Sequence, residues 1–194
     1  DHKFWNRYDH DNIDEPNVAA LPFEELDYTS KALYFAHGRH RHQVTKDDLR
    51  NARHGYYAMI SFIDDKIGEI LDTLKRTEQD QDTVVIFCAD HGEMLGERGM
   101  WFKQSFFEWS SRVPMLVSAP QQFLPRKVQE CVSLVDLLPT LVALGGGSLD
   151  IAHDGISLVP ALEGSKIRDL AICDYSGIGP CVPTRMVRRG QFKF

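Results

Sequence analysis

The hydrophobic positions between residues 49 and 74 recur every three or four residues. This spacing places one apolar stripe along a helix. The stripe consists of Leu49, Ala52, Tyr56, Ile60, Ile63, Ile67, Ile70 and Leu74. Thr45 offers an N-cap, and the acidic Asp48 three residues later completes the pattern that starts a helix well. We therefore predict a helix that begins after Thr45 and ends at about Arg76.

Two short apolar runs follow this helix, at residues 83–88 and 114–118. Because neither run alternates with polar residues, both are typical of strands buried on two faces of a parallel sheet. Residues 134–144 form a second helical pattern, with Ser133 or Asp136 as the cap and glycines at 145–147 as the end. Pro139 favours Asp136 as the cap, since proline belongs in a first turn. Helices that alternate with buried strands predict an α/β layered fold.

The two ends of the chain lack this regularity. Residues 1–30 are polar, aromatic and interrupted by Pro16 and Pro22, which indicates an ordered loop, whereas residues 190–194 alternate like a strand. The chain starts at Asp1 without an initiator methionine or a signal peptide, and it stops inside the strand pattern. We interpret the 194 residues as a piece of a longer protein.

Composition narrows the classes of partner. The chain carries 28 acidic and 22 basic side chains, for a net charge of -6, which argues against binding to a nucleic-acid backbone. No apolar run approaches the roughly 18 residues of a membrane span, so we expect no membrane partner. The four cysteines are too sparse for a disulfide framework and favour a reducing, cytoplasmic location.

The sharpest chemical feature is the sequence Asp90, His91, Gly92 directly after the first predicted strand. In open α/β sheets, ligands bind beyond the carboxyl ends of the strands. A carboxylate beside an imidazole in a short turn can ligate one divalent cation. The alternative is that Asp90 caps a loop beside a surface histidine.

A glycine-rich loop dense in aromatic residues comes next and contains Lys103. The lysine can return to the same site and present a cation to a tetrahedral anion, although most lysines are simply solvated. Five large aromatic side chains lie between residues 101 and 109. They are either core residues or the walls of a pocket for a quaternary ammonium group, which needs aromatic faces together with an acid.

These features come in the order and spacing of one known family. The chain resembles the C-terminal half of the catalytic domain of sulfatases, in the alkaline-phosphatase-like superfamily. The resemblance rests on Tyr56–Ala58, Ile63–Gly68, Val84–Phe87, Asp90–Gly92, Leu95–Glu97, Trp101–Lys103, Arg112–Pro114, Val135–Thr140 and Asp154–Leu158. Within the family it is similar to the choline-sulfatase group, on Tyr8–Asp11, Ile13–Pro16, the Asp-His pair and Arg188–Gly190.

The resemblance implies a fold and a set of functional residues. The fold would be an alkaline-phosphatase-like layered sheet with flanking helices, present as a fragment. Asp90 and His91 would be ligands of a divalent metal, calcium or alternatively manganese, and Lys103 would contact the sulfate oxygens. The nucleophile would be a formylglycine in an N-terminal part that is absent. Metal-assisted displacement of this kind places cations against an anionic transition state.

The same resemblance also implies a role for Asp174, which would hold a trimethylammonium group beside Tyr175. Ile178 stands where another acid is expected, so it argues against that specificity. Residues 181–185 fit a Cys-x-Pro-x-Arg nucleophile motif, but they follow the metal pair and lead into a strand pattern, so we interpret the motif as a decoy. Cys88 is interpreted as a packing residue.

Three histidines remain outside this scheme. His37, His40 and His42 suggest either a metal or anion patch or a solvated, basic stretch that leads into the long helix, and we favour the second interpretation.

The expected function is hydrolysis of choline O-sulfate, a small sulfate ester, by a homo-oligomeric parent enzyme. Phosphonate monoester or phosphodiester hydrolysis on the same scaffold is the enzymatic alternative, and a non-catalytic truncated remnant is the other. The fragment alone is expected to be inactive. We divide residues 1–194 into an irregular excursion (1–44), the best-matching core (45–164) and the start of a C-terminal subdomain (165–194).

Overall fold

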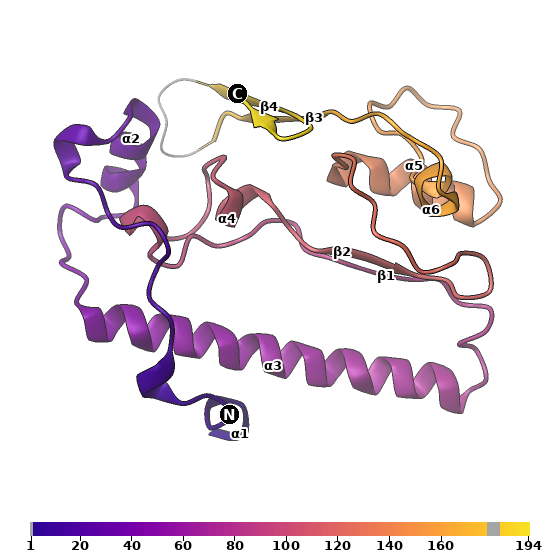
Figure 1. The fold of residues 1–194 in the computed structure, drawn as a ribbon, viewed down its shortest axis with the longest axis horizontal. Helices are drawn as coiled ribbons and strands as arrows, with labels where there is room; N and C mark the ends of the chain where they lie inside the picture. The colour runs from indigo at the N-terminus through magenta and orange to yellow at the C-terminus, as the bar shows by residue number, and fades with distance from the viewer. Residues whose placement is uncertain (1, 178–182) are drawn as a thin grey trace. The chain divides into compact units, whose positions relative to one another are not determined.

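The computed structural model describes residues 2–177 and 183–194. Their packing divides the chain into two compact units. The first unit contains residues 2–80 and 91–113, and the second contains Gln81–Asp90, Pro114–Ser176 and Pro183–Phe194. Figure 1 shows the elements of each unit.

The first unit is built on one long helix, α3 (Lys46–Arg76), and the predicted helix is thereby confirmed. The Asp48 N–H donates to the Thr45 hydroxyl over 3.1 Å, and the Thr45 N–H donates to the Asp48 carboxylate over 3.0 Å. This capping box satisfies two backbone donors that a helix start would otherwise leave open. The other helices of the unit are α1 (His2–Trp5), α2 (Tyr28–Ala36) and α4 (Glu108–Ser111).

Helix α2 lies in the stretch that the sequence analysis expects to be irregular. It begins because the Asp27 carboxylate accepts hydrogen bonds from the Ser30 N–H, at 2.9 Å, and from the Ser30 hydroxyl, at 2.5 Å. Leu33 is its one fully buried apolar side chain, and it packs in a small core with Met94 and Met100. A helix with one buried apolar side chain, whose packing partners lie some 60 residues away, leaves no periodic apolar signal in its own sequence.

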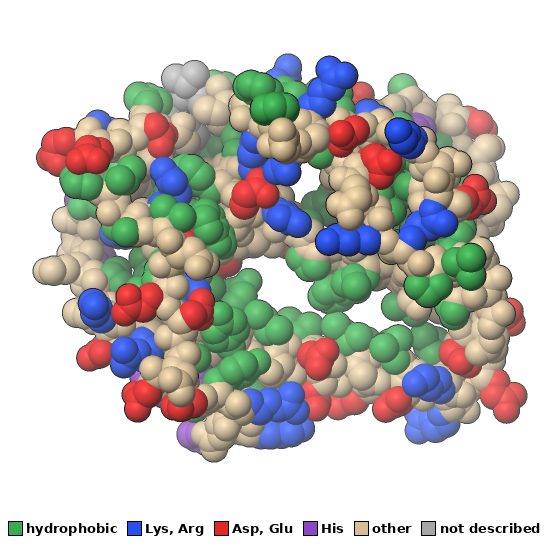
Figure 2. Space-filling model, viewed as in Figure 1, with side chains coloured by type: hydrophobic (Ala, Val, Ile, Leu, Met, Phe, Trp, Pro, Cys, Tyr) green, Lys and Arg blue, Asp and Glu red, His purple; other side chains and the backbone are tan. Residues whose placement is uncertain are grey.

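The hydrophobic side chains of α3 are covered only in part by the first unit. Phe62 meets Phe4 of α1 edge to face, with 5.4 Å between the ring centroids. The exposed hydrophobic side chains of the helix are Met59, Ile60, Phe62, Ile63, Ile70 and Leu71. Figure 2 shows hydrophobic side chains in a row along this helix. None of the helices in the described ranges combines the length and the apolar character required to cross a membrane.

The second unit contains two small sheets. Strands β1 (Val85–Cys88) and β2 (Met115–Ser118) pair antiparallel, with Val85 opposite Ser118. The prediction that these two runs lie parallel is wrong. Parallel pairing needs a long crossover, usually a helix, and the residues between them form loops and the single turn of α4. Nor are the strands buried on both faces in this unit, because Leu116 is 60% exposed.

The other sheet places β4 (Thr184–Arg189) between β3 (Ala171–Tyr175) and β5 (Phe192–Lys193), all antiparallel. The strand pattern at the C-terminal end is thus confirmed. The unit's two helices are α5 (Leu137–Leu144) and α6 (Val159–Glu163).

The structure decides between the two predicted caps in favour of Ser133, which forms a capping box with Asp136 around the short 3-10 helix Leu134–Asp136. The favoured choice of Asp136 is wrong, because its side chain makes no cap hydrogen bond to α5. The Asp136 carboxylate is buried and accepts from the Ser133 N–H, the Ile156 N–H and the Arg168 guanidinium over 2.8–2.9 Å. One aspartate therefore ties the start of α5 to the segment before α6.

Candidate active site

Asp90 and His91 are consecutive in the turn that follows β1, and both side chains are exposed. The next residue, Gly92, donates its N–H to the Ser110 carbonyl over 2.8 Å. A Cβ atom at residue 92 would lie 1.9 Å from the Trp109 carbonyl oxygen, a distance at which no side chain fits. Glycine is therefore required after the Asp-His pair because another backbone segment passes directly over it.

The His91 imidazole is oriented by its own turn. Its Nδ1 lies 2.8 Å from the Gly92 carbonyl oxygen, which can only accept, so Nδ1 carries the proton in this contact. In the neutral ring, Nε2 then bears the lone pair that a metal needs. A carboxylate oxygen and an oriented imidazole nitrogen fit a divalent cation as ligands. No group of three or more His, Cys, Asp or Glu side chains in the described chain could hold a metal. The role of Asp90 and His91 as metal ligands stays a prediction.

Lys103 lies in a loop that folds back toward the start of this segment. The Met94 N–H donates to the Phe102 carbonyl over 2.7 Å, and the Gly96 N–H donates to the Met100 carbonyl over 2.8 Å. Met94 and Met100 anchor the loop in the small core with Leu33. The backbone just before Lys103 thus lies against residue 94, three positions after His91. The return of the Lys103 side chain to the Asp-His pair stays a prediction.

Two of the aromatic residues of this loop take the first role considered for them, as core residues, and the pocket role stays a prediction. Phe107 and Trp109 pack against the methionine core. Phe102, in contrast, is 52% exposed. The loop is therefore partly core, as its apolar density predicts, with one exposed aromatic beside Lys103.

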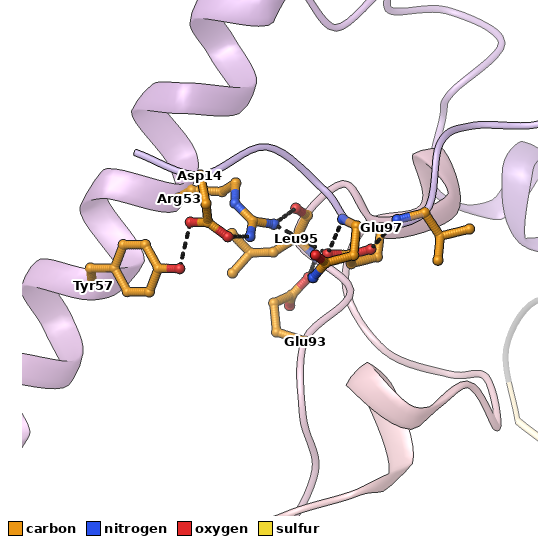
Figure 3. Close-up of polar contacts among 8 residues, drawn as sticks. Asp14, Arg53, Tyr57, Glu93, Leu95 and Glu97 are labelled. Atoms are coloured by element: carbon orange, nitrogen blue, oxygen red, sulfur yellow. Dashed lines mark hydrogen bonds and ion pairs between the residues drawn. The ribbon is translucent and has the colours of Figure 1, made fainter. Parts of the chain in front are cut away.

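A buried ion network fixes the other end of the loop (Figure 3). Glu97 is 2% exposed, and its carboxylate accepts from the Asn17 and Val18 N–H groups, each over 3.0 Å. Arg53 of α3 lies 3.7 Å from the Glu97 carboxylate and donates to the Leu95 carbonyl over 3.1 Å. The buried carboxylate thus has one hydrogen bond to each of its oxygens and a guanidinium at ion-pair distance, which together compensate for its burial. Residues 95–97 are therefore tied both to the N-terminal segment and to α3.

Asp14 completes this network at its more exposed side. It accepts hydrogen bonds from Arg53 and, over 2.6 Å, from the Tyr57 hydroxyl. Burial alone would raise the pKa of Asp14, but the hydrogen bonds from Tyr57 and Arg53 outweigh it and lower that pKa below 3.8. The hydrogen bond to Asp14 raises the pKa of Tyr57. The Asp14 carboxylate and the Arg53 guanidinium therefore stay ionised together throughout the neutral range.

Asp174, the residue expected at a trimethylammonium group, lies on β3 and is paired. Its two carboxylate oxygens accept from Nε and Nη2 of Arg185 on β4, over 2.6 and 2.9 Å. The hydrogen bond from Arg185 lowers the pKa of Asp174. A cationic ligand at this position would share the carboxylate with a guanidinium. Ile178 and Cys181 lie outside the described residues, but Thr184–Arg189 is a strand, as expected for a decoy nucleophile motif.

Several residues of the site carry no signal of their own in the sequence. Arg53 and Glu97 lie 44 residues apart, and each resembles the charged surface residue that its type usually is. The interpretation of His37 as part of a solvated stretch is wrong. Its ring is partly buried and contacts Phe102 and Gln104, the two neighbours of Lys103.

Comparisons with known proteins agree with this architecture. The model of the family described as Sulfatase matches residues 5–147. The choline-sulfatase of Rhizobium meliloti (strain 1021) is 38% identical over 99% of this chain and 38% of its own length. Arylsulfatase K of Rattus norvegicus is 32% identical over 95% of this chain and 34% of its own length. The chain thus spans less than two fifths of the curated relatives it matches.

A solved structure supports the fold. The phosphonate monoester hydrolase SpPMH from Silicibacter pomeroyi superimposes with a TM-score of 0.81 at 25% identity, over 97% of this chain and 43% of that one. The expected alkaline-phosphatase-like α/β fold, present as a fragment, is thereby confirmed. The family model matches most of the residues, and relatives match the chain along nearly its whole length. The chain therefore belongs to the sulfatase family.

Proposed function

We propose that this chain is part of a sulfuric ester hydrolase that converts choline O-sulfate to choline and sulfate. The observation that carries the proposal is the 38% identity to a choline-sulfatase over 99% of the chain. The exposed Asp90 carboxylate and the oriented His91 imidazole support it, because sulfate ester hydrolysis by a metal-assisted route requires ligands of this kind.

Asp90 and His91 would bind the metal, calcium in our proposal and manganese as the alternative. A bound divalent cation would polarise a sulfate oxygen as a Lewis acid. A hydrated formylglycine, which we assign to a part of the parent protein beyond these 194 residues, would supply the attacking oxygen. The task of this chain is then to hold the metal and to place positive charge against the anionic ester.

Lys103 would supply that positive charge. An ammonium group directed at the sulfate oxygens stabilises the charge that develops on them in the transition state. Asp174 is our candidate for the choline head group, since a carboxylate beside aromatic Tyr175 suits a trimethylammonium cation. With Arg185 on the same carboxylate, choline would have to share Asp174 or displace the guanidinium.

Phosphonate monoester hydrolysis is the second candidate. The structural likeness to the hydrolase SpPMH, with its TM-score of 0.81, favours it. Both candidates would use the same metal pair and the same lysine, so these residues do not separate them. The discrimination depends on the substrate.

The test uses the full-length parent protein, matured by a formylglycine-generating system and loaded with calcium. We expect kcat/KM for choline sulfate to exceed that for a phenyl phosphonate monoester by about tenfold or more, which corresponds to about 1.4 kcal/mol of transition-state discrimination. The reverse ratio would establish the phosphonate activity instead. Release of no product from either ester, with any divalent metal, would identify a non-catalytic remnant.

The metal assignment has its own test. Asp90→Asn should weaken calcium binding by at least about tenfold and lower activity in parallel, because it removes a ligand charge. Calorimetric titration of the metal into the full-length protein measures the first effect. Asp64→Asn, on an exposed position of α3, is the matched control. Calcium binding by Asp90→Asn equal to that of the control would show that Asp90 is no ligand.

We also propose a cytoplasmic, homo-oligomeric enzyme whose partner is the small sulfate ester. The free thiols Cys88, Cys131 and Cys173 are consistent with a reducing compartment. The net charge of -6 gives no support to a nucleic-acid partner.

A further inference from the structure

His37 caps the C-terminal end of α2 and meets both neighbours of Lys103. Its Nε2 lies 2.5 Å from the side-chain amide oxygen of Gln104, so the imidazole N–H donates a short hydrogen bond. The same ring meets Phe102 edge to face, with 5.0 Å between centroids and 69° between planes. One imidazole therefore touches the residue before and the residue after the lysine.

The backbone on both sides of Lys103 adopts an unusual conformation. Phe102 has φ 63° and Gln104 has φ 72°, in the left-handed region that residues with a side chain seldom occupy. Of the five non-glycine residues with positive φ in the described chain, four lie between residues 95 and 104. Such conformations persist only where surrounding contacts hold them, and they concentrate at functional sites.

The contacts that hold this segment come from three places. The Phe102 carbonyl accepts the Met94 N–H over 2.7 Å, and the Ser105 N–H lies 3.5 Å from the Ser110 hydroxyl. These bonds fix the backbone from within the loop. His37 contributes the side-chain contacts from a separate element, and α2 is itself anchored by buried Leu33 against Met94 and Met100.

We propose that His37 is a positioning residue for Lys103. It touches no substrate itself and acts through Phe102 and Gln104, which fix the backbone from which the lysine projects. The proposal rests on the proposed function, in which Lys103 faces the sulfate. Because a charge that must meet a transition state is sensitive to small displacements, loss of the contact lowers kcat more than it raises KM.

The experiment compares variants of the full-length, calcium-loaded protein with choline sulfate as substrate. His37→Leu removes the hydrogen bond, and Gln104→Leu removes it from the other side. Both should lower kcat by about tenfold or more while KM changes by less than about threefold. The double variant should be no worse than either single one, because both remove the same contact. His37→Gln, which keeps an amide donor near the position of Nε2, should recover most of the rate.

His42→Leu is the matched control, since His42 is an exposed histidine in the same stretch. A second readout is independent of turnover. Hydrogen exchange at the amides of residues 102–105 should quicken in His37→Leu and in Gln104→Leu, with no change in His42→Leu. A purely structural role would instead shift the melting temperature and leave kcat per folded molecule unchanged.

The outcomes separate this inference from the proposed function. If Lys103→Ala abolishes turnover while His37→Leu and Gln104→Leu match the His42→Leu control, the positioning role is wrong and the proposed function stands. If Lys103→Ala leaves turnover intact, the proposed role of the lysine fails first. Unchanged exchange at residues 102–105 in both leucine variants would overturn the positioning role whatever the substrate is.

Discussion

We expect Lys103→Ala to lower kcat of the full-length parent for its sulfate ester by about a hundredfold to a thousandfold. This is the range found when one donor directed at a developing negative charge is removed. The metal should stay bound, because Lys103 is not among the proposed ligands. Steady-state kinetics together with the metal content of the purified protein measure the two effects.

Lys66→Ala is the control for the loss of a lysine as such. Lys66 lies on the exposed side of α3, where it pairs with Glu69 over 2.6 Å. A surface pair of this kind contributes little, so the control should keep the parent's kinetics. If Lys103→Ala also keeps them, Lys103 is an ordinary solvated lysine.

The second large effect is expected on stability. Glu97→Gln should lower the free energy of unfolding by about 3–5 kcal/mol, since it removes one partner of a buried ion pair. The Glu97 carboxylate oxygens accept one bond each from the N–H groups of Asn17 and Val18, so the glutamine presents its NH₂ group to one of these two donors. It also withdraws the negative charge that faces Arg53. Denaturant unfolding of the full-length protein, followed by tryptophan fluorescence, measures the change.

Glu69→Gln tests whether the loss of stability comes from removing a buried charge rather than from removing any glutamate charge. Glu69 is an exposed glutamate of α3, and its replacement should change the unfolding free energy by less than about 0.5 kcal/mol. An unfolding midpoint of Glu97→Gln that coincides with this control would show that the buried network around Glu97 does not stabilise the folded protein as expected.

The sequence predicts well wherever the cause is local. The limits of α3 follow from the Thr45 capping box and a regular apolar stripe, and α5 follows from Ser133, Asp136 and the glycines beyond it. In each case the stabilising contacts lie within a few residues of one another. Local patterns of this kind can be recognised in the sequence without knowledge of the rest of the chain.

What the sequence does not predict depends on contacts between distant residues. The antiparallel pairing of β1 and β2 is decided by the path of the loop between them, which a run of apolar residues does not encode. Likewise, Arg53 meets Glu97 and His37 meets Gln104 across 44 and 67 residues. In the sequence, a buried charged residue such as Glu97 or a histidine such as His37 cannot be distinguished from a solvated residue, because its partners become its neighbours only in the folded chain.

The contact between Gly92 and the Trp109 carbonyl means that the residues of the Asp-His-Gly motif are under two different evolutionary constraints. Under the proposed function, Asp90 and His91 are needed as metal ligands, so a gene copy that loses activity is free to replace them. Gly92 is needed because no Cβ fits beneath the Trp109 carbonyl, so it must persist as long as the domain folds. In a survey of related genes, a glycine retained without its aspartate and histidine would therefore mark a descendant that still folds but lacks the proposed metal ligands.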